Sequence, residues 1–364
     1  SSISFSADED GTTMYIESLS KNIDATLALA EEKLLRPAFN KDDFKRVKKQ
    51  NIEGREAMKK NAQNLGFAYF KNQLFGETPF GRVITEKSIK KIKLSDIQSY
   101  YNNNYSPSIS SLVVVGDINK STLLSKIDFL RNWTPKEVLI PQNFDFPDSK
   151  ETTIYLLDKE GASQSFIVMG HLADKYDVEE DHFKSQIMNY PLGGGMSGRF
   201  FLNLREEKGW TYGANSMFMA SDKMGAFAMY TSVESEATDS ALVEIFKEFN
   251  AYRNSGITEK ELKFTKDAFL GREALKYETS GQKLGFLNRI LTYDLDKSYI
   301  DKQANILNSI TKADVDAITK AKIKPDEMSI IIVGNKYLVK KKLKNLESSA
   351  DGMKYSFKIK EIKY

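Results

Sequence analysis

One stretch of the chain, residues 192–213 (LGGGMSGRFFLNLREEKGWTYG), holds the side chains best suited to chemistry. Three successive glycines, Gly193, Gly194 and Gly195, free the backbone for a tight turn. Arg205 and Tyr212 stand seven positions apart, and both side chains donate hydrogen bonds. The guanidinium also keeps its charge at any working pH. This stretch is therefore the densest candidate for a functional site in the chain.

The elements around this stretch must position the pair. Ser197 is expected to cap a helix that runs to about Lys208 and ends at Gly209. Phe200, Phe201 and Leu204 would give that helix an apolar stripe. A strand should then start at residues 210–212, continue through 216–220 and return as a hairpin over 225–232.

Two other interpretations of the glycine-rich turn remain. A phosphate site is disfavoured, because the run lacks the GKS/T ending of a P-loop and does not sit in a βαβ dinucleotide unit. The plain structural alternative makes Arg205 a solvated helix residue and Tyr212 a packing residue. Composition alone favours this plain alternative.

Metal and thiol chemistry are sharply limited by composition. The chain has no cysteine, which excludes disulfides, thiolate zinc sites and thiol nucleophiles. His171 and His182 are the two histidines and stand eleven positions apart, so neither an HExxH nor an HxxEH zinc helix can form. Both imidazoles are expected to be hydrogen-bonded in the fold or solvated.

Length and charge narrow the class of protein. At 364 residues the chain exceeds one ordinary core and predicts two domains. The net charge of +3 provides no field for gathering nucleic acid, and no apolar run reaches the ~18 residues of a membrane span. The opening SSISFSADEDG lacks a signal-peptide pattern and fits a mature or truncated product.

An internal repeat organises the whole sequence. Residues 89–116 correspond to 307–334 at a constant offset of 218, so that LVVVG at 112–116 meets IIIVG at 330–334. Upstream the offset changes by a residue or more: Leu65-Gly66-Phe67 meets Leu284-Gly285-Phe286, and Met14-Tyr15 meets Met229-Tyr230.

Both copies predict the same order of elements. A strand and an amphipathic helix come first, followed by a long helix with Asn40 or Thr258 as its N-cap, shorter helices and a continuous apolar strand. Segregated strands and helices predict an α+β fold used twice. The expected ranges are 12–17, 22–35 and 111–116 in copy one, and 225–232, 239–252 and 328–333 in copy two.

The two copies of the repeat differ at their N-terminal ends. By the repeat arithmetic, copy one lacks about 65 residues that copy two has before Met229. A layer without its first strands would expose a sheet edge and an apolar face. We therefore expect a further N-terminal segment, or a partner that supplies it.

The segment LGGGMSGRFFLNLREEKGWTYGANS resembles the signature of the second half of pitrilysin/insulinase-like metallopeptidases, peptidase family M16, particularly the mitochondrial-processing-peptidase-like type. There a glycine-rich turn precedes a helix and an Arg…Tyr pair seven apart. The RPAF turn, the PFGR loop at 79–82 and SLVVVGD at 111–117 extend the resemblance over essentially the whole chain.

The resemblance implies an architecture and a division into domains. The fold would be α+β, with two tandem homologous α/β sandwich domains of the insulinase-like type, each a sheet with helices on one face. The first domain would span 1–131 and lack its N-terminal part. A linker would cover 132–150, and the second domain would cover 151–364 and carry the glycine-rich turn.

The resemblance also implies roles for the candidate residues. Arg205 and Tyr212 would donate hydrogen bonds to a substrate carbonyl and stabilise the oxyanion that forms during zinc-dependent hydrolysis. The turn of Gly193, Gly194 and Gly195 would contact substrate. The peptide would join a sheet edge as an extra strand.

Zinc itself is expected in a partner half. Active zinc halves of the family carry two glutamates seven apart on a long helix, and the alignment places Val47 and Gly54 there. A one-residue shift brings in Glu53, but its partner would then be Arg46. The chain would thus hold no cofactor and work with a zinc-bearing half, as a separate subunit or an upstream part of a longer precursor.

The resulting hypothesis is the substrate-binding half of a zinc-dependent peptidase that cleaves oligopeptides or unfolded segments. The alternative is a non-catalytic scaffold or assembly subunit of the same fold. Expected partners are the zinc half and a peptide substrate, without nucleic acid or a membrane span. Relatives of this kind favour a bacterial periplasm or cell envelope, although the compartment is not determined by the sequence.

Overall fold

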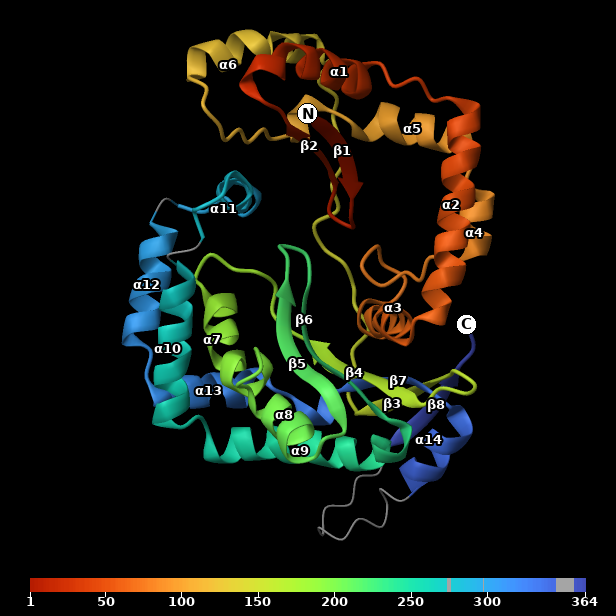
Figure 1. Cartoon of the computed structure of the whole chain (residues 1–364), viewed down its shortest axis with the longest axis vertical. Helices are drawn as coiled ribbons and strands as arrows, with labels where there is room; N and C mark the ends of the chain where they lie inside the picture. Colours follow the sequence, from red (N-terminus) through yellow and green to blue (C-terminus); the bar gives the residue numbers. More distant parts are fainter. Residues whose placement is uncertain (274–275, 297, 345–356) are drawn as a thin grey trace. The chain divides into compact units, whose positions relative to one another are not determined.

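The structure is a computed structural model that describes residues 1–273, 276–296, 298–344 and 357–364 (Figure 1). The chain forms two compact units, each discontinuous in sequence. The predicted domains at 1–131 and 151–364 follow the sequence repeat rather than these units, and that division stays a prediction. The first unit comprises Ser1–Glu56, Ile84–Pro141 and Lys276–Asp294, and the second comprises Ala57–Val83, Gln142–Leu275 and Leu295–Tyr364.

The second unit is built on a mixed six-stranded sheet with the strand order β5-β6-β4-β7-β3-β8 (Figure 1). Neighbours from β5 to β7 run antiparallel, whereas β3 runs parallel to both β7 and β8. The strands are β3 (Thr153–Asp158), β4 (Gln164–Leu172), β5 (Thr211–Ala220), β6 (Gly225–Glu234), β7 (Ser329–Gly334) and β8 (Lys358–Ile362).

Helices of the second unit pack on this sheet and on one another. Strands and helices are segregated in sequence, which confirms the predicted α+β class. The helices are α3 (Ala62–Phe75), α7 (Asp181–Gly193), α8 (Arg199–Phe201), η4 (Leu202–Glu207), η5 (Ser235–Ala237), α9 (Thr238–Ser255), α10 (Glu259–Glu273), α12 (Tyr299–Ser309), α13 (Lys312–Lys322), η6 (Pro325–Glu327) and α14 (Lys336–Leu343).

The sheet of the second unit is buried on both faces. Alternate residues of β7 point to opposite sides: Ile330 and Ile332 join the core under α7 and α9, while Ile331 and Val333 join a second core. A strand covered on both faces needs apolar residues throughout, which accounts for the unbroken IIIV sequence.

The second core is closed by α3, a helix from the first copy of the repeat. The prediction placed helices on one face of the sheet, and α3 adds a helix on the other. Leu65 and Phe70 of α3 are buried there. The approach is close at Gly66, where an added Cβ would lie 2.5 Å from the ring of Phe166.

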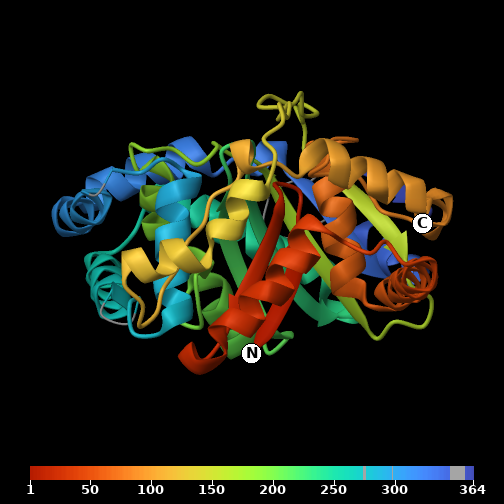
Figure 2. The same cartoon turned by 90° about the horizontal axis from the view of Figure 1, so that it is seen from above.

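The first unit holds a two-stranded antiparallel sheet and several helices, of which α2 is the longest. Figure 2 shows α1 lying over the β1–β2 hairpin. Asn40 caps α2 as predicted, since its Oδ1 accepts hydrogen bonds from the amides of Asp42 and Asp43 at 2.8 and 3.2 Å. The elements are β1 (Ser2–Ala7), β2 (Thr12–Glu17), η1 (Ser20–Asn22), α1 (Ile23–Leu35), α2 (Lys41–Lys60, whose last turn enters the second unit), α4 (Glu86–Lys91), α5 (Leu94–Asn104), η2 (Pro107–Ile109), α6 (Lys120–Lys126), η3 (Asp128–Asn132) and α11 (Ser280–Thr292).

The predicted strand at 111–116 is wrong. Its counterpart at 328–333 forms β7, but 111–116 has no strand structure, and Leu112 and Val114 are 55% and 39% exposed. The difference lies in the neighbours: β7 exchanges hydrogen bonds with β3 on one side and β4 on the other. An apolar sequence alone cannot form a strand without a partner for its backbone groups.

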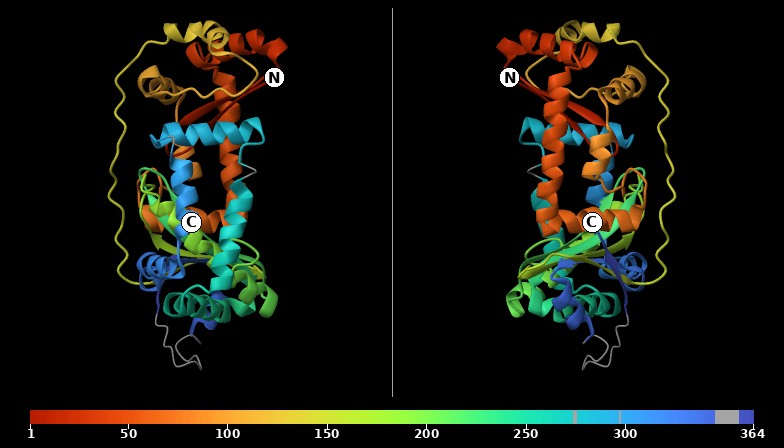
Figure 3. Two further views of the ribbon diagram at one scale, coloured as in Figure 1. Left: turned by 90° about the vertical axis from the view of Figure 1, so that its left-hand side faces the viewer. Right: turned by 90° about the vertical axis from the view of Figure 1, so that its right-hand side faces the viewer.

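Residues 133–152 form no helix or strand and run as an extended stretch (Figure 3). In the described part of the chain, no helix has both the length and the apolar character required to cross a bilayer.

Candidate functional site

The glycine-rich turn joins α7 to α8 and differs from the prediction at one end. Gly194 follows α7 and donates its amide to the carbonyl of Tyr190 at 3.0 Å. Ser197 does not cap the next helix: Gly198 is the N-cap and no side chain accepts its amides. At the far end the prediction is confirmed, because Gly209, with φ of +70°, follows the last helical turn.

Two of the three glycines are required by packing. An added Cβ at Gly193 would lie 2.7 Å from the amide nitrogen of Ser216 on β5, and one at Gly194 would lie 2.7 Å from Cα of Tyr190. At Gly195 an added Cβ would meet no heavy atom within 4 Å. The turn thus presses α7 against β5, where Asn189 Nδ2 also donates to the carbonyl of Ser216 at 2.7 Å.

We expect Gly193→Ala to lower the free energy of unfolding by about 1–3 kcal/mol, because a backbone atom of Ser216 blocks the new methyl group. Gly195→Ala is the matched control and should stay within ~0.5 kcal/mol of the parent. Urea unfolding of both variants, followed by circular dichroism, measures the difference. Equal stabilities would show that the close contact at Gly193 relaxes without cost.

The helix that carries Arg205 changes its winding. After α8 the chain enters the π-helical segment η4, in which the amide of Lys208 donates to the carbonyl of Asn203, five residues back, at 3.0 Å. Single π-helical turns are rare and concentrate at functional sites. Phe200 and Leu204 of the predicted apolar stripe are buried.

Asn203 ties the π-helical turn to α9. Its Nδ2 donates to Glu244 Oε2 at 3.1 Å and to Glu248 Oε1 at 2.8 Å. Burial acts to raise the pKa of Glu244, but hydrogen bonds from Asn203 and Lys247 outweigh it, and the pKa lies below its usual value. The carboxylate is therefore charged and holds the turn in place.

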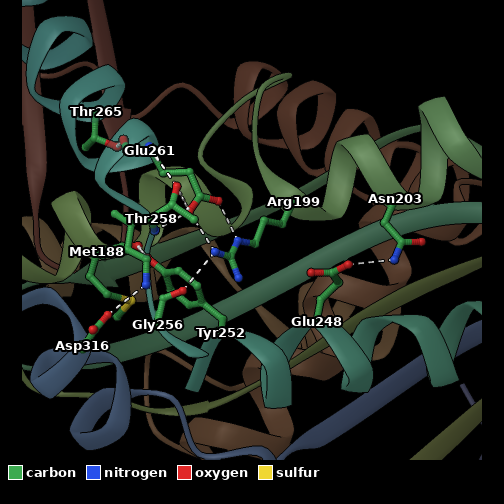
Figure 4. Close-up of polar contacts among 11 residues, drawn as sticks. Met188, Arg199, Asn203, Glu248, Tyr252, Gly256, Thr258, Glu261, Thr265 and Asp316 are labelled. Carbon is green, nitrogen blue, oxygen red and sulfur yellow. Dashed lines mark hydrogen bonds and ion pairs between the residues drawn. The ribbon is translucent and has the colours of Figure 1, made fainter. Parts of the chain in front are cut away.

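A partly buried ion pair fixes the start of the same helix (Figure 4). Arg199 Nε and Nη2 donate to the two carboxylate oxygens of Glu261 at 2.7 and 2.8 Å, and the guanidinium carbon lies 4.7 Å from the ring centre of Tyr252. Glu261 also closes the capping box with Thr258, whose amide donates to it at 2.7 Å. This confirms Thr258 as the predicted cap and anchors α8 to α9 and α10.

The side chains of Arg205 and Tyr212 lie next to each other. Neither packing nor helix periodicity alone predicts this contact. The guanidinium carbon of Arg205 lies 5.2 Å from the ring centre of Tyr212, in cation–π distance. Tyr212 is 83% exposed, and Arg205 is half-buried. Among the described residues, the side chain of Arg205 has no ion-pair or hydrogen-bond partner, so its guanidinium donors are free.

A bulge at the start of β5 turns Tyr212 outward. Regular pairing with β6 is interrupted between Thr211 and Ala214. Thr211 Oγ1 accepts the amide of Gly213 at 3.0 Å, and Thr231 Oγ1 on β6 lies 2.9 Å from the carbonyl of Gly213. Bulges of this kind redirect a side chain out of the strand pattern.

A shallow pocket of about 200 Å³ lies beside Tyr212. Polar groups from the strands β4, β5 and β6 meet there with Gln63 of α3. Hydroxyl, amide and backbone groups around a small apolar patch suit a peptide backbone. The lining residues are Gln63, Gln164, Phe166, Thr211, Tyr212, Gly213, Tyr230, Thr231 and Ser232.

His171 has a structural role, as expected. Its Nδ1 lies 2.8 Å from the carbonyl of Leu172, and its Nε2 accepts the amide of Lys324 at 3.2 Å. Burial lowers the pKa of His171 to about 4. Within the described ranges, no three His, Asp or Glu side chains gather to hold a metal ion.

A family profile and two curated proteins are similar to this chain. The profile described as "Peptidase M16 inactive domain" matches residues 91–269. The "Non-peptidase homolog YmxG" of Helicobacter pylori is 26% identical over 88% of this chain and 74% of its own length. The "Probable inactive metalloprotease YmfF" of Bacillus subtilis is 22% identical over 83% of this chain and 71% of its own length.

A solved structure gives the same fold. The peptidase M16 inactive domain from Pseudomonas fluorescens superimposes with a TM-score of 0.83 at 24% identity, covering 92% of this chain and 81% of that one. The chain spans from 49% to 74% of the length of the curated relatives it matches.

Several supporting residues were missed from sequence. Arg199 and Glu261 stand 62 positions apart, and Asn203 reaches carboxylates 41 and 45 positions away. The sequence contained one indication of this network, the capping-box spacing of Thr258 and Glu261. That spacing identified the start of α10 but not Arg199 as a partner of Glu261. No sequence pattern indicated that Gln63, which lies in the first copy of the repeat, would line the pocket.

Proposed function

Because this chain belongs to peptidase family M16 and matches its inactive domain, we propose that it is the substrate-binding half of a two-part, zinc-dependent peptidase. The observation that carries the proposal is the pair of Arg205 and Tyr212. A cation without a partner in the described chain lies against an exposed tyrosine, beside a pocket of peptide-like polarity.

Two donors at one place can hold one carbonyl oxygen. Arg205 offers guanidinium N–H groups and Tyr212 offers its O–H, so both can donate to a substrate carbonyl as negative charge builds on its oxygen. The ring also restricts the guanidinium, which reduces the entropy lost when the arginine binds. Zinc held by the other half would supply Lewis-acid activation for hydrolysis.

The surroundings favour an extended, sequence-tolerant peptide. Gln63 and Gln164 offer amide donors and acceptors beside Phe166 and Tyr230, which provide apolar contact. Such groups recognise a peptide backbone better than a particular side chain. In this proposal the turn of Gly193, Gly194 and Gly195 supports the site and brings the substrate close to the backbone.

A second function is favoured by a specific observation. The two relatives named above are described as a non-peptidase homolog and a probable inactive metalloprotease. A scaffold that binds another subunit without helping catalysis would fit those names. Such a scaffold has no use for an unpaired Arg205 beside an exposed Tyr212, which is why we place it second.

The test is complementation with a zinc-bearing half of the same family from the same genome. We expect the chain alone to contain no stoichiometric zinc and to cleave no unstructured fluorogenic peptide. The mixture of both halves should cleave it at least ~10²-fold faster than the zinc half alone. Zinc content is measured by mass spectrometry of the purified chain.

Two results would contradict the proposal. One tightly held zinc ion per chain would remove the zinc-less assignment. A complex of the two halves that forms, but cleaves no faster than the zinc half alone, would support the scaffold instead.

A further inference from the structure

The most exposed large apolar side chain that the structure describes is that of Leu139, which is 88% exposed. It lies with Ile140, 43% exposed, in residues 137–143 (EVLIPQN), within the extended stretch at 133–152 (Figure 3). We call residues 137–143 the strap. Single exposed apolar residues are common on helices and strands, but these two stand on a chain without regular structure.

The backbone of the strap is as accessible as its side chains. In the ranges that the structure describes, no hydrogen bond, ion pair or aromatic contact involves a residue of the strap. Endopeptidases bind a substrate as an extended strand, through backbone N–H and C=O groups that helices and sheets use for their own hydrogen bonds. The strap can therefore enter such a cleft without prior unfolding of the protein.

Both ends of the strap are held in place. On its N-terminal side, the amide of Lys136 donates to Oγ of Ser106 at 2.9 Å, and this hydroxyl donates to the carbonyl of Lys136 at 3.0 Å. On its C-terminal side, the ring centre of Phe144 lies 5.2 Å from that of Phe80, and Phe144 packs on the core closed by α3. Accessibility is thus concentrated in the strap itself.

We propose that the strap is a processing site for an endopeptidase that selects a large apolar residue after the scissile bond. The bond cut is that between Val138 and Leu139. Water supplies a hydroxyl to the carbonyl carbon of Val138 and a proton to the nitrogen of Leu139, as the C–N bond between them breaks. The products are residues 1–138 and 139–364. The proposed peptidase function has no part in this step.

The sequence of the strap favours this bond over the next one. Leu139 offers the more exposed side chain of the two apolar neighbours. Ile140 is followed by Pro141, whose ring restricts the backbone of Ile140 and lacks an N–H group for a protease to bind. The bond before Ile140 is therefore the poorer substrate.

The cut protein should stay assembled, because its two parts are interleaved. The chain passes between the two units after residues 56, 83, 141, 275 and 294. Ala57–Val83 precedes the cut but belongs to the second unit, where Leu65 and Phe70 of α3 are 1% and 0% exposed. Residues 1–138 could leave only by exposing this core to water. Cleavage therefore converts one chain into a two-chain protein and opens one of the connections between the units.

Limited digestion of residues 1–364 with thermolysin, which cuts before large apolar residues, tests the proposal. We expect the first cut between Val138 and Leu139, identified by mass spectrometry of the two fragments. The fragments should co-elute at the volume of the intact chain in size-exclusion chromatography and separate only in urea. Leu291 is an internal control: it is 51% exposed but lies on the helix α11, so no early cut should occur before it.

A pair of matched variants makes the test specific. Leu139→Asp should slow the first cut at least ~10-fold, because the protease loses the apolar side chain that it selects. Leu291→Asp should leave that rate unchanged, and both variants should keep the parent Tm because both side chains are exposed. A first cut outside the strap, fragments that separate without denaturant, or equal rates for Leu139→Asp and the parent would overturn the proposal.

Discussion

Tyr212→Phe should lower kcat of the reconstituted peptidase by roughly 10²–10³, equivalent to ~2.7–4 kcal/mol of barrier, with a smaller change in KM. The variant removes one hydroxyl donor and keeps the ring on which Arg205 rests. Because Tyr212 is 83% exposed, the substitution should leave the free energy of unfolding unchanged. Steady-state cleavage of an unstructured fluorogenic peptide measures the effect.

Arg205→Lys tests the other donor. A flexible ammonium cannot reproduce the planar donors of the guanidinium, so a loss of similar size is expected. Tyr337→Phe is the matched control, since Tyr337 is a tyrosine of similar exposure, 82%, on α14. Unchanged kcat/KM in both Tyr212→Phe and Arg205→Lys, with normal thermal melts, would leave the pair without a catalytic role.

The second large effect is a loss of stability in mild acid caused by His171. Its pKa is lowered to about 4 in the fold, mainly by burial, against an ordinary value of 6.5. Above pH 6.5 the imidazole is neutral in both states and has no effect. As the pH falls from 6.5 to 4, the imidazole of His171 becomes protonated in the unfolded chain but stays largely neutral in the folded chain. Stability should fall by about 3 kcal/mol over this window.

Urea unfolding at a series of pH values separates this effect from carboxylate titration. Glu261 and other carboxylates with lowered pKa contribute equally in all variants. His171→Asn removes the titrating group, so its stability should depend less on pH than that of the parent. The expectation fails if His171→Asn and the parent show parallel curves between pH 4 and 6.5.

Local patterns predicted the elements well. The strand expected at 12–17 is β2, and the helices expected at 22–35 and 239–252 are α1 and α9 with small changes at their ends. Caps were also predictable, since Asn40 and Thr258 act on amides two or three residues ahead. These features depend on neighbours in sequence, which the sequence displays directly.

Features that depend on distant partners were not predictable. Residues 111–116 have the composition of a buried strand but lack the two neighbours that make β7 a strand. The π-helical turn at Asn203 is stabilised by carboxylates on α9, which no local pattern indicates. For the site, the resemblance to a family singled out Arg205 and Tyr212, whereas the bulge and the pocket around them required the fold.

The position of α3 also constrains the order in which the protein can form. Its apolar face, with Leu65 and Phe70, leaves the ribosome long before its sheet exists. The strands it packs on, β4 (Gln164–Leu172) and β7 (Ser329–Gly334), follow later in the sequence. The nascent chain must therefore carry the unburied apolar face of α3 until β7 has been synthesised. Synthesis is the stage at which this protein most needs protection from aggregation.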